Sequence, residues 1–278
     1  MSIIAKRFIK IEIKKKQHIA WIILNRPDKL NAINSIMLNE LSEALDHLES
    51  EINVKCIIIK GHGEKAFSSG VDLTELWELT PETAAEFSTI GQQVFSKLEE
   101  MSKPVLAAIK GYALGGGLEL ALACDFRIAA DNAELGCPEI KLGLIPAWGG
   151  TQRLPLIVGI SNAKRLIMIG DRLKANEASE MGLVDKVFPL NELEVELEKL
   201  AKRLVKCSMV PQSQVEHAIN TVMKVSQGAL KKETEAFVRL LSAKKIKKNW
   251  EILGLRETKE NCKVKTATIF GRDEPRIK

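Results

Sequence analysis

The sequence predicts an α/β protein, and three observations lead to this fold class. Short apolar runs rich in β-branched residues alternate with longer segments of helical periodicity along the first two-thirds of the chain. Residues 191–278 carry an almost entirely helical pattern. The 278 residues, 45% hydrophobic and 28% charged, have the composition of a globular protein. This length suits one large domain, or a domain with a smaller appendage.

The expected strands are short and apolar. Phe8, Ile9, Ile11 and Ile13 alternate with polar residues, which is the period of a half-buried strand. Residues 55–60 form a continuous apolar run between two lysines, typical of a buried strand. The strands predicted in this way cover residues 7–13, 18–25, 55–60, 104–109, 126–130 and 183–188.

The expected helices lie between and after these strands. Ser35 is a suitable cap for a helix with Met37, Leu38, Leu41 and Leu45 on one face. The predicted helices cover residues 35–50, 81–101, 118–124, 149–159, 161–170, 174–181, 191–206 and 212–226, and a last one begins near residue 229. Glycine and serine clusters at residues 61–63, 68–70 and 111–117 are interpreted as turns.

Charge is unevenly distributed. The net charge is +5, but the last 48 residues hold 14 Lys and Arg against 7 Asp and Glu, so the first 230 are close to neutral. A basic segment can contact phosphate, and it can equally be a solvated helix face. No run approaches 18 uninterrupted apolar residues, which excludes a spanning helix.

Cysteine and histidine spacings argue against a metal or disulfide framework. The five cysteines are widely spaced, with no Cys-x-x-Cys pair, and the four histidines show no metal-ligand spacing. We therefore expect no disulfide framework and no metal. The N-terminal segment lacks the apolar core of a secretory signal, so a cytoplasmic protein is expected.

The strongest local signal is a strand, a glycine triplet and a helix start over residues 105–125. Three consecutive glycines, Gly115 to Gly117, let the backbone approach a ligand closely. The free N–H groups of the following helical turn stabilise an anion or a developing oxyanion. Leu120 replaces the third glycine of a dinucleotide fingerprint, and Gly116-Gly117-Leu118 lacks the Gly-Lys-Ser/Thr of a phosphate-binding loop.

Two glutamates near this turn are candidates for acid–base chemistry. Glu119 interrupts an otherwise apolar helix, where a carboxylate is costly unless a site accommodates it. Glu139 follows Pro138 in a short connection, and together the two can take and give a proton. The alternative for Glu119 is an exposed first-turn residue that only satisfies the helix dipole.

Two further segments are expected near the same site. Phe67-Ser-Ser-Gly-Val-Asp72 follows a buried strand, and its glycine turn can supply a second backbone donor. Trp148 lies in a loop that leads into a helix, and it can either line the pocket or fill the core.

Five segments in order resemble the enoyl-CoA hydratase/isomerase (crotonase) family. They are Asn25-Arg-Pro-Asp-Lys-Leu-Asn-Ala32, Phe67-Ser-Ser-Gly-Val-Asp72, Gly111-Tyr-Ala-Leu-Gly-Gly-Gly-Leu-Glu-Leu-Ala-Leu-Ala-Cys-Asp125, Pro138-Glu139 and Gly149-Gly-Thr-Gln-Arg-Leu154. The resemblance spans nearly the whole chain. It implies a spiral of repeated ββα units over residues 1–190 and a helical, basic oligomerisation region over residues 191–278.

The resemblance also implies an activity, the reversible hydration of trans-2-enoyl-CoA to 3-hydroxyacyl-CoA in fatty acid metabolism. It assigns the catalytic roles to Glu119 and Glu139 and the oxyanion-hole N–H groups to Val71 and Gly116. The residues that it places near the acyl-CoA substrate are Lys29, Ser69, Asp72, Leu73, Gly115 and Trp148. Coenzyme A belongs to the substrate, so no separate cofactor is implied, and a homotrimer or hexamer is the expected assembly.

Two other functions stay open. A Δ3-Δ2-enoyl-CoA isomerase needs only the glutamate at position 139, and the second glutamate argues against it as the main activity. RNA binding through the basic C-terminal stretch is the alternative from another class, although the region has few aromatic residues for stacking. Residues 244–255 form an extra stretch that departs from the family pattern.

Overall fold

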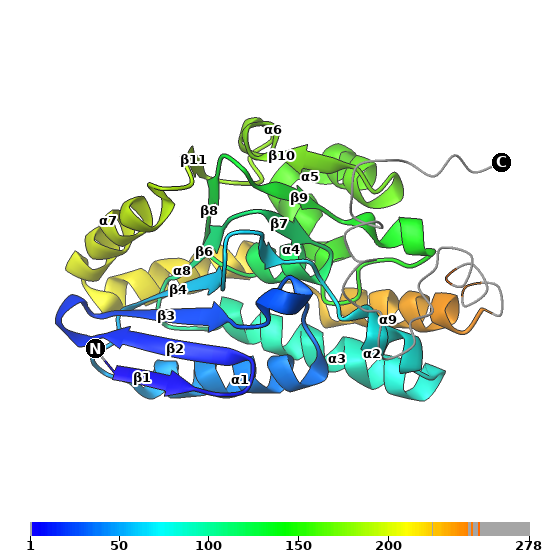
Figure 1. Cartoon of the computed structure of the whole chain (residues 1–278), viewed down its shortest axis with the longest axis horizontal. Helices are drawn as coiled ribbons and strands as arrows, with labels where there is room; N and C mark the ends of the chain where they lie inside the picture. Colours follow the sequence, from blue (N-terminus) through cyan, green and yellow to red (C-terminus); the bar gives the residue numbers. More distant parts are fainter. Residues whose placement is uncertain (1, 224, 244–245, 247–249, 251–278) are drawn as a thin grey trace.

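The computed structural model describes residues 2–223, 225–243, 246 and 250 (Figure 1). Its strands are β1 (Ser2–Ala5), β2 (Ile9–Lys14), β3 (Ile19–Leu24), β4 (Cys56–Gly61), β5 (Ala66–Ser68), β6 (Val105–Ile109), β7 (Tyr112–Leu114), β8 (Phe126–Ala130), β9 (Glu134–Gly136), β10 (Arg172–Lys174) and β11 (Lys186–Phe188). Its α-helices are α1 (Ser35–Ser50), α2 (Leu73–Glu78), α3 (Pro81–Glu99), α4 (Gly116–Leu122), α5 (Gly150–Met168), α6 (Ala175–Glu180), α7 (Leu193–Lys206), α8 (Met209–Met223) and α9 (Gln227–Leu241). Short 3₁₀ helices are η1 (Lys15–Gln17), η2 (Pro27–Lys29) and η3 (Pro138–Leu142). Within this described part, no helix has the length and apolar character needed to cross a membrane.

The strands form two sheets, and successive ββ units contribute one strand to each sheet. A seven-stranded sheet has the order β1-β2-β3-β4-β6-β8-β11, and a four-stranded sheet has the order β10-β9-β7-β5. In three successive units the first strand (β4, β6, β8) joins the large sheet and the second (β5, β7, β9) joins the small one. A helix ends each unit, so the chain winds as a spiral of ββα units, and this prediction is confirmed.

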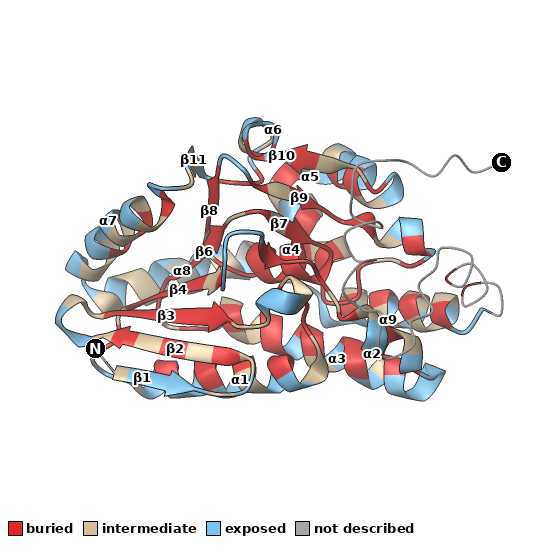
Figure 2. Ribbon diagram, in the orientation of Figure 1, coloured by how far each residue is buried: buried red, intermediate tan, exposed pale blue. Residues whose placement is uncertain are grey.

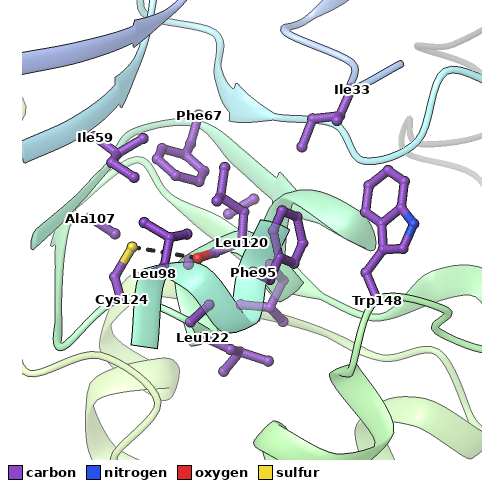
Figure 3. Close-up of a cluster of buried hydrophobic side chains, with 14 of the residues drawn as sticks. Ile33, Ile59, Phe67, Phe95, Leu98, Ala107, Leu120, Leu122, Cys124 and Trp148 are labelled. Carbon is purple, nitrogen blue, oxygen red and sulfur yellow. Dashed lines mark hydrogen bonds between the residues drawn. The ribbon is translucent and has the colours of Figure 1, made fainter. Parts of the chain in front are cut away.

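The central strands of the large sheet, such as β3 and β6, are buried on both faces, whereas the edge strand β1 is largely exposed (Figure 2). Alternate residues of β4 point to opposite sides, so that Ile57 and Ile59 join the main core and Cys56 and Ile58 join a second cluster. Helix α7 covers that second cluster with Leu193, Leu197 and other apolar residues. The main core includes α4 and the nearby Cys124, two residues after the helix ends, whose Sγ lies 3.4 Å from the Leu120 carbonyl oxygen (Figure 3).

The sequence analysis missed the shortest elements. Strands β1, β5, β7, β9 and β10 and helix α2 were not expected, and β7 lies inside the segment interpreted as a turn. Three-residue strands are too short to show a period, and their partners lie in other units of the spiral. The two helices expected at residues 149–159 and 161–170 are confirmed: α5 spans both, and its backbone leaves the helical conformation between them at Gly159, with φ 79° and ψ 157°.

The predicted division at residue 190 remains a prediction. Helix α9, from the C-terminal side of that boundary, packs on α3 and α5 rather than standing apart. Of the extra stretch at residues 244–255, only Ile246 and Trp250 are described, and both are buried. The other residues of that stretch, and all of the basic residues after position 243, lie outside the described part.

Candidate active site

A cavity of about 50 Å³ lies where the small sheet, α4, η3 and α9 meet. Its walls come from segments that are far apart in sequence. They include Ser69, Gly70, Val71, Leu73, Leu76, Phe87, Gly115, Gly116, Glu119, Pro138, Glu139, Leu142, Leu144, Ile145, Ala147 and Phe237. Seven of the ten predicted site residues therefore meet at one place: both glutamates, both backbone donors, Ser69, Leu73 and Gly115.

Two backbone N–H groups at the cavity, those of Val71 and Gly116, have no acceptor among the loop and turn hydrogen bonds of the described residues. Ile33 donates to the Gly70 carbonyl and accepts from the Asp72 N–H, so the Val71 N–H between them points to the opposite side. Gly116 is the first residue of α4, where a helix leaves its N–H without an intrahelical acceptor. The two residues are close, because a Cβ at Gly116 would lie 3.4 Å from Val71 Cγ2.

Helix α4 places Glu119 one turn below Gly115, and the loop after η3 binds its carboxylate. The Glu119 Oε1 atom accepts hydrogen bonds from the Trp148 N–H at 2.8 Å and the Gly150 N–H at 2.7 Å. Glu119 is only 1% exposed, which excludes the alternative of a solvated helix-dipole residue. Burial raises the pKa of Glu119, and the negative charges of Glu233 and Glu139 add to the rise, while the two N–H groups oppose it.

Glu139 faces the same cavity from η3, where Pro138 begins the short helix. Both of its carboxylate oxygens are buried, and neither has a hydrogen-bond partner among the described residues. Burial raises the pKa of Glu139 to about 7. A buried carboxyl without donors is most stable in its neutral form, so this group is suited to carry a proton.

The remaining predicted residues lie around the cavity rather than in its wall. The Asp72 carboxylate pairs with the Arg26 guanidinium at 2.7 Å and caps α2 through the Thr74 N–H. Lys29 is half-buried in η2, and its carbonyl lies 3.5 Å from the Ser69 hydroxyl.

The Trp148 side chain fills the core between Phe87 and Phe95, with ring centroids 5.2 and 5.5 Å away. Figure 3 shows it in the same buried cluster as Phe95. Its indole N–H donates to the Phe87 carbonyl at 3.3 Å. Of the two alternatives for Trp148, the structure therefore places the side chain in the core, where its ring packs against Gly116, while its backbone N–H binds Glu119.

Sequence reasoning missed two contributors from α9, Phe237 and Glu233. Phe237 lines the cavity, and Glu233 is a buried carboxylate that binds the loop beside Glu119. A signal for Glu233 was present, because it falls on the buried stripe formed by Leu230, Phe237 and Leu241. A charged residue on an apolar helix face indicates a buried polar contact.

No group of three or more His, Cys, Asp or Glu side chains in the described part of the chain is arranged to hold a metal ion. A second, larger cavity of about 630 Å³ lies elsewhere, between α5, α7 and α8. It shares no lining residue with the cavity that contains the two glutamates.

Comparison with known proteins identifies the family of the chain. Residues 14–263 match the family model described as "Enoyl-CoA hydratase/isomerase". A short-chain-enoyl-CoA hydratase of Clostridium acetobutylicum is 41% identical over 226 residues, which cover 81% of this chain and 87% of that protein. A crotonyl-CoA hydratase of Syntrophomonas wolfei is 45% identical over 195 residues, covering 70% of this chain and 75% of that protein.

A solved structure shares the fold. The crystal structure of an enoyl-CoA hydratase from Bacillus anthracis superposes with a TM-score of 0.76 at 35% sequence identity, covering 89% of this chain and 96% of that chain. The crotonase-like fold expected from the sequence is confirmed by this likeness and by the ββα spiral.

Proposed function

The chain belongs to the enoyl-CoA hydratase/isomerase family, and on this premise we propose that it reversibly hydrates short trans-2-enoyl-CoA thioesters to 3-hydroxyacyl-CoA. It is an enzyme of the hydratase type, with a place in fatty acid metabolism. The observation that carries the proposed chemistry is the meeting of two buried carboxyls and two free backbone N–H groups at one cavity.

The backbone donors act on the thioester carbonyl. The N–H groups of Val71 and Gly116 bind its oxygen, and their bonds strengthen as negative charge moves onto that oxygen during addition. One such donor contributes about 2.7–4 kcal/mol to transition-state stabilisation. Because both donors are backbone groups held by a strand end and a helix start, the site needs no polar side chain for this purpose.

The two glutamates divide the proton transfers. The Glu119 carboxylate takes a proton from water as the water oxygen bonds to C3 of the substrate. The C2=C3 electron pair moves toward C2 and the thioester oxygen, and Glu139 delivers its proton to C2. One proton shared by the pair serves both directions: hydration starts with it on Glu139 and dehydration with it on Glu119.

The size of the cavity supports a short acyl chain. About 50 Å³ remains between apolar walls that include Leu76, Phe87, Ile145 and Phe237. The relatives named for short-chain enoyl-CoA and crotonyl-CoA substrates point the same way. The coenzyme A moiety then extends past Ser69 toward Lys29 and Asp72, outside the cavity wall.

No cofactor or metal takes part in this proposal, because the carboxyl pair and the backbone donors cover every step. Coenzyme A is part of the substrate. Full hydration activity in the presence of a chelator is the expected result, and activity that a chelator abolishes and a divalent ion restores contradicts it.

We further propose a trimer or hexamer in the cytoplasm. Helices α5 and α8 carry exposed apolar side chains beside the 630 Å³ cavity, namely Leu156, Ile160, Val215 and Ile219. Clustered exposed apolar residues are typical of a contact surface between subunits. Light scattering at micromolar concentration tests the assembly, and a monomer contradicts it.

The activity test measures loss of the enoyl-thioester absorbance when crotonyl-CoA is added to the purified chain. Hydration of crotonyl-CoA and dehydration of 3-hydroxybutyryl-CoA are expected. Conversion of a 3-enoyl-CoA without either reaction instead identifies the isomerase alternative. A gel shift with RNA at low and high salt tests the other alternative, for which steep salt dependence is expected.

A further inference from the structure

The four residues at the start of α5 distribute their N–H groups alternately between two buried carboxylates. Trp148 and Gly150 donate to Glu119 Oε1, at 2.8 and 2.7 Å. Gly149 donates to Glu233 Oε1 at 2.7 Å, and Thr151 donates to Glu233 Oε2 at 3.0 Å. One carboxylate belongs to the proposed chemistry, and the other is not explained by it.

Glu233 reaches this loop from α9, a helix distant in sequence. Leu230 and Phe237, on either side of it along the same helix face, are buried and anchor α9 in the core. Glu233 itself is 3% exposed. It also accepts from Gln92 Nε2 at 3.1 Å and from the Thr151 hydroxyl.

Burial raises the pKa of Glu233, and the hydrogen bonds that it accepts from Thr151, Gly149 and Gln92 oppose this rise, so its partners favour the ionised carboxylate. Backbone and amide N–H groups can only donate, so both oxygens act as acceptors. No salt bridge to Glu233 occurs in the described part of the chain. The nearby Arg153 is already used, because it binds the Glu99 carboxylate at 2.8 Å and the Trp148 carbonyl at 2.8 Å.

We propose that Glu233 is a positioning residue for hydration: it holds the loop from Trp148 to Thr151 so that two of the loop's N–H groups fix Glu119 for its reaction with water. This inference rests on the proposed function. It adds a connection from α9 to the chemistry that runs through the backbone of the loop, without contact between Glu233 and the substrate.

The charge of Glu233 gives this role a separate signature. Three titratable groups surround Glu119: Glu233 on α9, Glu139 on η3 and the thiol of Cys137, which directly precedes η3. The ion pair between Arg153 on α5 and Glu99 on α3 lies beside the loop. The negative charge of Glu233 raises the pKa of Glu119. Removing that charge lowers the pKa of Glu119, so the acidic limb of the hydration profile moves to lower pH.

The experiment compares Glu233→Gln, Glu233→Asp and the control Glu235→Gln in the full chain, with crotonyl-CoA as substrate. Glu235 lies on the exposed face of the same helix.

Both Glu233 variants should lower kcat about ten- to a hundredfold, the scale of a small misplacement of a reacting group. KM should stay within about twofold, because the thioester is held by Val71 and Gly116. Only Glu233→Gln should shift the acidic limb, since Glu233→Asp keeps the charge.

The outcomes separate the two proposals. Wild-type protein that does not hydrate crotonyl-CoA overturns the proposed function. If the wild type hydrates crotonyl-CoA and Glu233→Gln has an unchanged kcat and pH profile, only the positioning role is overturned.

If Glu233→Gln does not fold, Thr151→Val is the second variant, because it removes the hydroxyl donor to Glu233 and leaves the carboxylate in place. A kcat reduced several-fold at constant KM supports the role, and a wild-type kcat in Thr151→Val overturns it.

Discussion

Gly115 stands directly against Glu139. A Cβ at position 115 would lie 2.9 Å from Glu139 Oε1, a separation that real Cβ atoms do not show. Gly115 also has φ 51°, in the left-handed region that favours glycine. The first glycine of the triplet is therefore required for two reasons, the turn into α4 and the space that the Glu139 carboxyl occupies.

Gly115→Ala should lower hydration strongly while leaving the protein folded. The added methyl displaces the Glu139 carboxyl, and misplacing a reacting group by about 1 Å costs on the order of a hundredfold in rate. Gly182→Ala is the matched control, because Gly182 also has a positive φ, 76°, but no atom within 4 Å of its Cβ position. Both variants should lose about 1–3 kcal/mol of stability from backbone strain, and Gly115→Ala the more, because φ 51° with ψ −126° at position 115 lies outside the left-handed helical region that Ala can adopt. Equal kcat values for the two variants contradict the steric argument.

The pH profile of hydration should fall on its alkaline side. Burial raises the pKa of Glu139 to about 7, and in hydration this group must be protonated to give its proton to C2. The value of kcat/KM, which reports the free enzyme, should therefore decrease about tenfold per unit well above pH 7. Because the glutamates are close, the apparent pKa belongs to the pair. Stopped-flow rates from about pH 5.5 to about 9 test this, and a flat profile to the upper limit contradicts it.

Glu139→Gln should stabilise the fold at alkaline pH. The folded-state pKa of Glu139 lies above its usual value, so its favourable contribution is present at acidic pH and is lost as pH rises through about 7. The amide cannot ionise and avoids that loss. Each unit of pKa shift corresponds to about 1.4 kcal/mol, and a chain of this size gains about 2–4 °C in Tm per kcal/mol.

Calorimetry at about pH 5 and about pH 8 checks this prediction. The difference in Tm between Glu139→Gln and wild type should increase with pH, whereas Glu235→Gln, at an exposed site, should follow wild type. A difference that is the same at both pH values shows that the substitution acts through packing and not through ionisation.

Elements whose contacts lie close by in the sequence could be predicted, and elements stabilised by distant segments could not. Six of the seven strands of the large sheet, all except β1, and the helix of Glu119 are encoded locally, in runs such as residues 55–60 and 105–125, and these predictions are confirmed. The three-residue strands β5, β7 and β9 pair with one another although they belong to different units of the spiral. Their sequences therefore contain no local pattern that predicts them.

The site shows the same division between local and distant contacts. Gly116 and Glu119 lie within one turn of helix, and the structure brings them together with Val71 and Glu139 as expected. Glu233 contacts Thr151 from 82 residues along the chain, a distance over which sequence spacing carries no information. From sequence, Trp148 could either line the pocket or fill the core. The packing of Phe87 and Phe95 around its ring decides for the core.

The sharpest test of the proposed chemistry removes the two ionisable groups without changing their shape. Glu119→Gln and Glu139→Gln should each lower kcat for crotonyl-CoA hydration about 10²–10⁴-fold, the size of a general acid–base contribution. If the two carboxyls share one proton and act on one water, the double variant should lose much less than the product of the single losses. Binding of a non-reactive acyl-CoA should persist in all three, because the backbone of Val71 and Gly116 holds the thioester.

Isomerisation distinguishes the two roles within this set. Moving a proton between carbons needs one carboxyl and no activated water, so Glu119→Gln should spare conversion of a 3-enoyl-CoA more than Glu139→Gln does. The assignment of proton transfer to Glu139 is supported by its two carboxylate oxygens, which have no hydrogen-bond partner among the described residues, whereas Glu119 is held by two N–H groups. A folded Glu119→Gln variant that hydrates at the wild-type rate refutes the role of Glu119 as base. The loop from Trp148 to Thr151 would then serve only to satisfy a buried carboxylate, and the chain would be better described as an isomerase.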